Sequence, residues 1–207
     1  MSYRCRGQVF DGRALCFPNN TVPDCEQSAC ANQIGASTIA VTSDDYLVIV
    51  EQGPRSNIAK GLLASSGSGS ADWNDVAGLT DLQQFVKHFA LRELTEECGL
   101  KANDVAWCKI MGYGRLLDRG GLPQFFCLAK LNCAFRKIHV TRSERTLTDY
   151  HNRIYISEEG RTRYAAIQDA VSPLRRAGDR VFSSLWWSLE MLSLMSPSDM
   201  EDAFSGR

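Results

Sequence analysis

Long apolar runs are missing from this sequence. No stretch of the 207 residues approaches the roughly 18 uninterrupted apolar residues of a membrane-spanning helix. The first 30 residues also lack the continuous apolar segment that a secretory signal needs. We therefore expect a cytoplasmic protein that makes no contact with a membrane.

An excess of positive charge is missing as well. The chain has 23 basic and 24 acidic side chains, a formal net charge of −1. Binding to nucleic acid usually leaves a basic stripe or patch, so we expect no nucleic-acid partner and a small soluble substrate. With 44% hydrophobic and 23% charged residues, the composition is that of one globular domain.

Cysteine, in contrast, is plentiful, with eight residues. Three of them lie in apolar runs, where a free thiol behaves as a small hydrophobic side chain: Cys108, Cys127 and Cys133. Four others precede the apolar part of the chain: Cys5, Cys16, Cys25 and Cys30. These four leave a zinc site open, but their spacing is not that of the usual paired knuckles, and we favour unligated thiols.

The chain divides into three parts. Residues 1–35 show neither strand alternation nor a helical period, and we expect an N-terminal extension there. Residues 36–196 carry the apolar segments of the globular domain, and residues 197–207 are expected to be a C-terminal tail. Trp186 and Trp187 lie in the last apolar run, as core residues or as the subunit contact of a homodimer.

The apolar segments predict a mixed sheet between helices, an α/β fold. Residues 38–42 and 46–51 form one expected hairpin, and residues 105–113 and 124–133 a second one. Residues 152–157 resemble a short strand. Ser172-Pro173 is an expected helix start, because proline is tolerated at the first helical position, and residues 180–195 resemble a closing helix.

One helix has signals at both ends. Thr80 and Gln83 have the spacing of a capping box, and Gly99 fits a glycine just beyond a helix end, so we predict a helix over residues 81–98. At about 100° per residue, Glu93, Glu96 and Glu97 share a sector of roughly 100°. The acids continue the apolar face of the first half of the helix, which consists of Leu82, Phe85, Val86, Phe89 and Ala90.

Three carboxylates on a core-facing sector repel one another and lose solvation unless a cation joins them. Oxygen ligands and an open site favour Mg²⁺ or Mn²⁺, which keep water and phosphate oxygens in their other positions. The competing interpretation is a solvated surface patch with an ion pair between Arg92 and Glu96. The apolar residues on the same sector favour the metal.

The segment Arg92-Glu93-Leu94-Thr95-Glu96-Glu97-Cys98-Gly99-Leu100 resembles the second half of the Nudix box, R-E-U-x-E-E-x-G-U with U aliphatic. The resemblance implies the Nudix-type α/β/α sandwich with a mixed β-sheet. It also implies that Glu93, Glu96 and Glu97 hold Mg²⁺ (or Mn²⁺), which neutralises a diphosphate and activates water. Arg92 would then orient the glutamates, and the general base is left open.

The first half of the box, G-x5-E-x7, can be aligned in two ways. Counting back without a gap places Gly78 at the glycine and Gln84 at the first glutamate, so one acid has become an amide. In the alignment that we prefer, Gly67 and Gly69 form the glycine loop near the diphosphate, and residues 70–79 are an insertion. A plain flexible linker is the alternative for these glycines.

The resemblance implies a divalent-metal-dependent pyrophosphohydrolase that cleaves the phosphoanhydride of a nucleoside diphosphate linked to another moiety, such as a nucleotide sugar. The substrate is thus a small nucleotide. Arg55 and Arg115 are candidate phosphate-binding residues, although each also fits a solvated surface arginine. Two rival functions stay open: a catalytically weak nucleotide-binding sensor, and a Nudix-fold isomerase of prenyl diphosphates.

Overall fold

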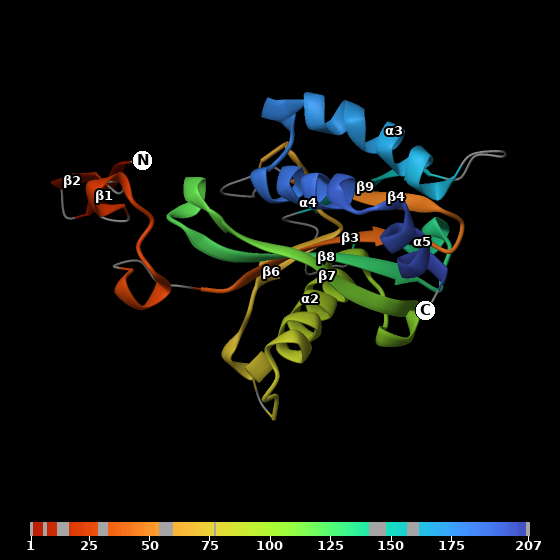
Figure 1. Cartoon of the computed structure of the whole chain (residues 1–207), viewed down its shortest axis with the longest axis horizontal. Helices are drawn as coiled ribbons and strands as arrows, with labels where there is room; N and C mark the ends of the chain where they lie inside the picture. The colour runs from red at the N-terminus through yellow and green to blue at the C-terminus, as the bar shows by residue number, and fades with distance from the viewer. Residues whose placement is uncertain are drawn as a thin grey trace.

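The chain folds into three layers. The computed structural model describes residues 2–5, 8–11, 17–28, 33–53, 60–76, 78–140, 148–156 and 162–205. A seven-stranded mixed sheet has helix α2 (Leu82–Cys98) on one face. Three helices cover the other face (Figure 1): α3 (Arg163–Arg176), α4 (Ser183–Leu194) and α5 (Pro197–Ser205). The predicted α/β/α sandwich with a mixed sheet is confirmed.

The sheet has the strand order β5-β4-β3-β8-β7, with β6 also paired to β3 and β9 to β4. Both predicted hairpins are present: β3 (Gly35–Val41) with β4 (Tyr46–Gln52), and β7 (Val105–Leu116) with β8 (Leu122–Leu131). The parallel pair β3 and β8 joins them. The remaining strands are β5 (Leu63–Ala64), β6 (Gly67–Ser70) and β9 (Thr148–Tyr155), the last of which begins four residues before the predicted strand.

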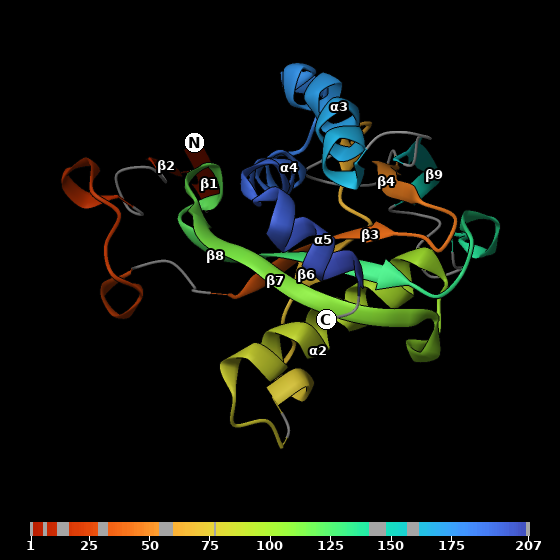
Figure 2. The ribbon, with the colours of Figure 1, turned by 45° about the vertical axis from the view of Figure 1, so that its right-hand side comes forward.

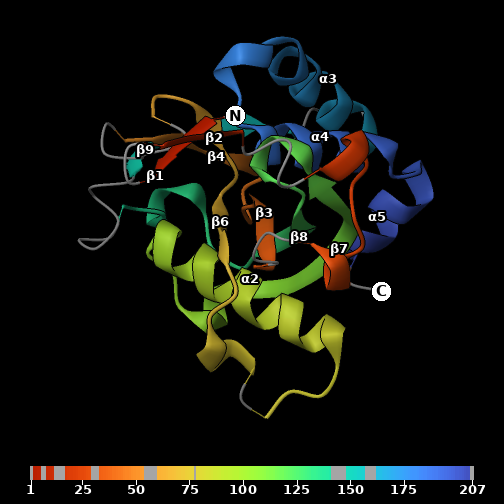
Figure 3. The ribbon, with the colours of Figure 1, turned by 90° about the vertical axis from the view of Figure 1, so that its left-hand side faces the viewer.

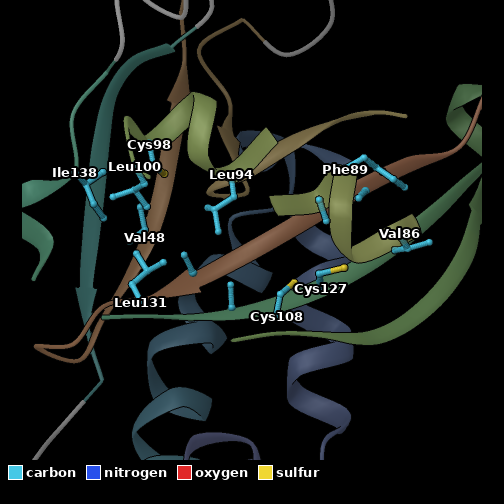
Figure 4. Close-up of a cluster of buried hydrophobic side chains, with 14 residues drawn as sticks. Val48, Val86, Phe89, Leu94, Cys98, Leu100, Cys108, Cys127, Leu131 and Ile138 are labelled. Atoms are coloured by element: carbon cyan, nitrogen blue, oxygen red, sulfur yellow. The ribbon is translucent and has the colours of Figure 1, made fainter. Parts of the chain in front are cut away.

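Strand β3 is buried along its whole length, because helices cover both faces of the sheet. Its small residues Ala36 and Ala40 face α2, whereas Ile39 and Val41 face the three-helix layer. Figure 4 shows the α2 side of this core, where Val86, Phe89 and Leu94 extend from the helix toward the strands. Small side chains on the strand allow α2 to lie close to the sheet.

The three-helix layer differs from the sequence predictions in two places. Helix α3 begins at Arg163, where the Thr162 side chain accepts a hydrogen bond from the Ala165 amide, so Pro173 lies inside its last turns and does not open it. Only one backbone hydrogen bond is lost to a proline there. Residues 197–205, expected to be a tail, form α5, which follows α4 in the three-helix layer (Figure 2). Met200 and Ala203 of α5 are buried.

Short elements complete the described chain. Strands β1 (Ser2–Cys5) and β2 (Gln8–Asp11) form a separate two-stranded sheet. The 3-10 helices are η1 (Pro18–Asn20), η2 (Cys25–Gln27), η3 (Trp73–Val76), η4 (Ala102–Asp104), η5 (Leu117–Arg119), η6 (Phe135–Lys137) and η8 (Gly178–Arg180). In the described part of the chain, no helix has both the length and the apolarity to cross a membrane.

The cysteine predictions can be tested in part. Cys108 and Cys127 are buried free thiols, as predicted, and Cys133 is half-buried. Cys25 is exposed and forms no disulfide, while Cys16 and Cys30 lie outside the described residues. The two tryptophans face different directions, because Trp186 packs in the three-helix core and Trp187 is exposed. A homodimer contact at Trp187 stays a prediction.

Candidate active site

Helix α2 ends immediately after the predicted metal-binding glutamates. Its N-cap is Asp81, whose carboxylate accepts a hydrogen bond of 2.7 Å from the Gln83 amide, so the predicted cap at Thr80 is off by one residue. Gly99 ends the helix with a left-handed φ of 63°, as predicted. These caps fix the helix limits and therefore the rotation of the glutamates toward the sheet.

The three glutamates form a gradient of burial. Glu97 is only 7% exposed and Glu93 has 16% of its side chain exposed, whereas Glu96 has 52% exposed. Two of the three acids therefore continue the apolar sector, as the helical wheel predicts, and Glu96 lies at its edge. Leu82, expected on the same sector, is exposed at the first turn of the helix.

Strand β6 lies directly against Glu93 and Glu97, and Figure 3 shows this strand beside α2. The Ser68 amide donates a hydrogen bond of 2.8 Å to Oε1 of Glu97. A Cβ atom on Gly69 would lie 2.1 Å from the carboxyl carbon of Glu93, and one on Gly67 would lie 2.5 Å from Cα of Leu94. The glycines are thus required for close approach, and the flexible-linker alternative is wrong for β6.

Arg92 connects the glutamates to the segment that follows β6. Its guanidinium lies 2.9 Å from Oε1 of Glu93 and 3.3 Å from Oε2 of Glu96, and it donates to the carbonyl of Ser70 at 3.1 Å. It also bonds both oxygens of Asp75 in η3, Nε to Oδ1 at 3.0 Å and Nη2 to Oδ2 at 2.9 Å. Arg92 therefore organises the carboxylates from within the cluster.

Arg92 and Asp75 each stabilise the charged form of the other. Hydrogen bonds from Arg92 hold the pKa of the Asp75 carboxyl below its usual value, and the bond to Asp75 raises the pKa of the Arg92 guanidinium. A bidentate, charge-assisted pair of this kind is stronger than a neutral hydrogen bond and fixes the orientation of both groups. Both side chains are ionised at neutral pH.

Two solved structures have this arrangement of elements. A Nudix hydrolase from Alicyclobacillus acidocaldarius matches with a TM-score of 0.59 at 14% identity, over 86% of this chain and 97% of its own. Protein DR0079 from Deinococcus radiodurans matches with a TM-score of 0.50 at 12% identity, over 79% of this chain and 86% of its own. This chain has the Nudix fold. No family model and no curated protein matches its sequence.

The Nudix fold places the predicted box residues on one helix end, but not the other candidates. Arg115 lies at the tip of the hairpin of β7 and β8, where it donates to the main-chain carbonyls of Gly121 and Pro23. It thus fastens the hairpin to the N-terminal segment. Arg55 lies outside the described residues. Gln84 is exposed on the solvent side of α2, as the helical wheel predicts.

Sequence reasoning missed Asp75, which is 3% exposed and contacts Arg92 more extensively than either glutamate does. The signal that could have found it is its spacing. Five residues separate Gly69 from Asp75, as five separate the glycine from the first glutamate of the Nudix box. The surrounding insertion, rich in small and polar residues, masks this signal.

The donors of the site suit a hard divalent cation, because all of them are oxygens. The backbone at Gly69 lies directly against the Glu93 carboxylate, which fills the place that a Cβ atom would take. Among the described residues, no group of three or more His, Cys, Asp or Glu side chains is arranged to hold a metal ion. Arg92 and the Ser68 amide hold the carboxylates instead.

Proposed function

We propose that this protein is a Nudix pyrophosphohydrolase that uses Mg²⁺ or Mn²⁺ to cleave a nucleoside diphosphate linked to another moiety, with nucleotide sugars as the leading substrate class. The observation that carries the proposal is the pair Glu93 and Glu97, held against a glycine strand at the end of α2 in a Nudix fold. Carboxylates in contact with the backbone of a half-buried glycine strand are suited to bind a cation and a diphosphate together.

Glu93, Glu96 and Glu97 would hold the cation, which when bound neutralises the diphosphate and lowers the pKa of water. Glu97 is fixed by the Ser68 amide, so its carboxylate has one defined direction. Glu96 is the most exposed of the three, so its side chain can turn from Arg92 toward a cation at low cost. Arg92 holds Glu93 and neutralises part of the carboxylate repulsion.

The β6 backbone would position the diphosphate. Gly67 and Gly69 remain our candidates for the residues against which phosphate oxygens lie, because no side chain at Gly69 separates the strand from the glutamates. Arg115 stays a candidate only if the hairpin tip reaches the distal part of the substrate, since its guanidinium already binds two carbonyls. A small nucleotide is the substrate class that fits these roles.

Purified protein should release a nucleoside monophosphate from at least one member of a panel of nucleoside diphosphate derivatives when Mg²⁺ is present. EDTA should abolish the release, and Glu97→Gln should reduce it by about 100-fold or more, the scale expected for a lost acid-base or metal-orienting group. Glu51→Gln, on strand β4 of the same sheet, is a control outside the glutamate cluster. No release across the panel would contradict the proposal.

The two rival functions give different results in the same assay. A nucleotide-binding sensor would be stabilised thermally by a nucleotide without releasing product. A prenyl diphosphate isomerase would need a reactive cysteine, but burial raises the pKa of the Cys98 thiol well above its usual value, and that thiol donates to the carbonyl of Ser66. Cys98 is therefore poorly suited to act as a catalytic acid or base.

A further inference from the structure

Asp75 is a buried acid that the Nudix motif does not account for at this position. It lies in η3, inside the segment that separates β6 from α2. Besides the two bonds from Arg92, its Oδ2 accepts a hydrogen bond of 2.7 Å from the Asp72 amide, and its Oδ1 lies 3.7 Å from Nε2 of His88. Together these contacts fix the orientation of the Asp75 carboxylate.

The sequence spacing gives Asp75 a place in the motif. The interval from Gly69 to Asp75 is that of G-x5-E, with aspartate in place of glutamate. Between Asp75 and Arg92 lie residues 76–91, which are sixteen residues where the box has seven. The extra residues therefore follow the first acid of the box and do not precede it. The gap-free alternative uses Gln84, which is exposed on the opposite side of α2.

The contacts of Arg92 show what such an acid does. Its Nε and Nη2 bind Asp75, while Nη1 lies against Glu93 and Glu96. An arginine that binds one carboxylate through two parallel N–H groups has its plane fixed. The position of Nη1, and with it the position of the two glutamates, then depends on Asp75.

We propose that Asp75 takes the place of the first acidic residue of the Nudix box and is a positioning residue, which holds Arg92 so that Glu93 and Glu96 converge on a divalent cation. The proposal rests on the metal-dependent function proposed above. It removes the difficulty raised by Gln84, because the acid is retained at another place in the sequence. It also assigns a role to η3, which anchors the insertion to the catalytic end of α2.

Metal binding without substrate tests this role directly. Calorimetric titration with Mn²⁺ should show binding weakened by about 10- to 100-fold in Asp75→Asn, the range found when groups that orient metal ligands are removed. Asp75→Glu should restore most of the affinity. Asp72→Asn is the matched control, because its exposed side chain lies in the same segment. Gln84→Glu should change nothing.

Kinetics separate positioning from a merely structural effect. In Asp75→Asn we expect kcat at saturating Mg²⁺ to recover toward the wild-type value, while the Mg²⁺ concentration needed for half activity rises and KM for the nucleotide changes little. Unchanged Mn²⁺ affinity together with a lower melting temperature would overturn the proposal. Tighter Mn²⁺ binding in Gln84→Glu would also overturn it, since Gln84 would then be the position of the first acid.

If Asp75→Asn does not fold, Arg92→Lys replaces it: lysine keeps the charge but cannot bind Asp75 through a planar fork, so Mn²⁺ affinity should fall similarly, and unchanged affinity refutes the role. If the wild type binds Mn²⁺ and Asp75→Asn weakens that binding, while no nucleotide is cleaved, the positioning role stands and the hydrolase proposal fails. If the wild type binds no Mn²⁺, both fail.

Discussion

The two faces of the sheet bury very different chemistry. On one face, a single helix and strand β6 surround ionised side chains, and the three carboxylate residues that are buried in the described chain, Asp75, Glu97 and Asp104, all lie in or next to α2 in the sequence. On the other face, three helices bury a cluster that is almost wholly apolar. Its buried polar residues include Ser184 and Ser188, with the Ser188 hydroxyl donating to the carbonyl of Ser184.

This difference indicates that one face of the sheet mainly stabilises the fold and the other carries the chemistry. Buried charge is costly unless each group is paired, and the α2 face meets that condition through Arg92, Ser68 and Lys137. Among the described residues, the three-helix face buries no ionised side chain at comparable cost, and it stabilises the fold mainly through the burial of apolar side chains. We therefore expect substitutions on the three-helix face to change stability and those on the α2 face to change chemistry.

The largest expected effect is on stability and tests the three-helix face. Leu189 is fully buried on α4, and Leu189→Ala should lower the free energy of unfolding by about 2–5 kcal/mol through the lost contacts and the cavity. Turnover per folded molecule should not change. Leu194, 74% exposed on the same helix, is the control, and Leu194→Ala should cost less than about 0.5 kcal/mol.

Urea unfolding followed by fluorescence, combined with activity measured well below the transition, checks both parts. A loss of turnover in Leu189→Ala that exceeds its unfolded fraction would break the comparison, because the three-helix face would then reach the active site.

A pair of glycines tests the α2 face. In Gly69→Ala the new Cβ meets only the end of the flexible Glu93 side chain, so the carboxylate should move by about 1 Å and turnover should fall by about 100-fold with little loss of stability. In Gly67→Ala the new Cβ meets the backbone of Leu94, which cannot move easily. That substitution should lower the free energy of unfolding by about 1–3 kcal/mol.

The contrast between the two glycines is the decisive measurement. Equal losses of stability, with turnover per folded molecule unchanged in both variants, would show that β6 has a packing role only. Melting temperatures and initial rates with the best nucleotide of the panel are sufficient to distinguish these results.

The positions of helices and strands are predicted best where local sequence signals determine them. Helix α2 has caps and an apolar sector, and both hairpins have turn residues between apolar runs, so their positions follow from local rules. Strand β6 does not, because Ser-Gly repeats favour a linker and only the close contact with α2 makes them a strand. The helix across Pro173 and helix α5 also depend on packing, because α3 contacts both α4 and α5, and this packing outweighs local propensity.

The candidate site was predictable in its motif but not in its supports. Glu93, Glu96 and Glu97 follow from spacing, and their burial follows from the wheel. Asp75 lies where a short 3-10 helix folds back on α2; its interval from Gly69 matches that of the box, but the insertion before α2 hides this signal. A periodic pattern in the sequence does not reveal long-range contacts of this kind. The bonds between Arg92 and Asp75 are therefore seen only in the structure.

The smallest expected effect concerns pH and compares the ion pair of the α2 face with the neutral three-helix face. Because pairing with Arg92 lowers the pKa of folded Asp75, its stabilisation is complete above the pKa of the unfolded chain, about 3.9, and is lost as pH falls through the lower folded pKa. The contribution of this ionised carboxylate to the stability difference between wild type and Asp75→Asn should therefore be complete above about pH 5 and shrink below about pH 4, by roughly 1.4 kcal/mol per unit that separates the two pKa values. Urea titrations at several pH values measure this difference. The same series on Leu189→Ala should show no such decline, since leucine has no proton to gain. A difference that stays constant down to pH 2 would mean that Asp75 stabilises the fold through its shape and not through its charge.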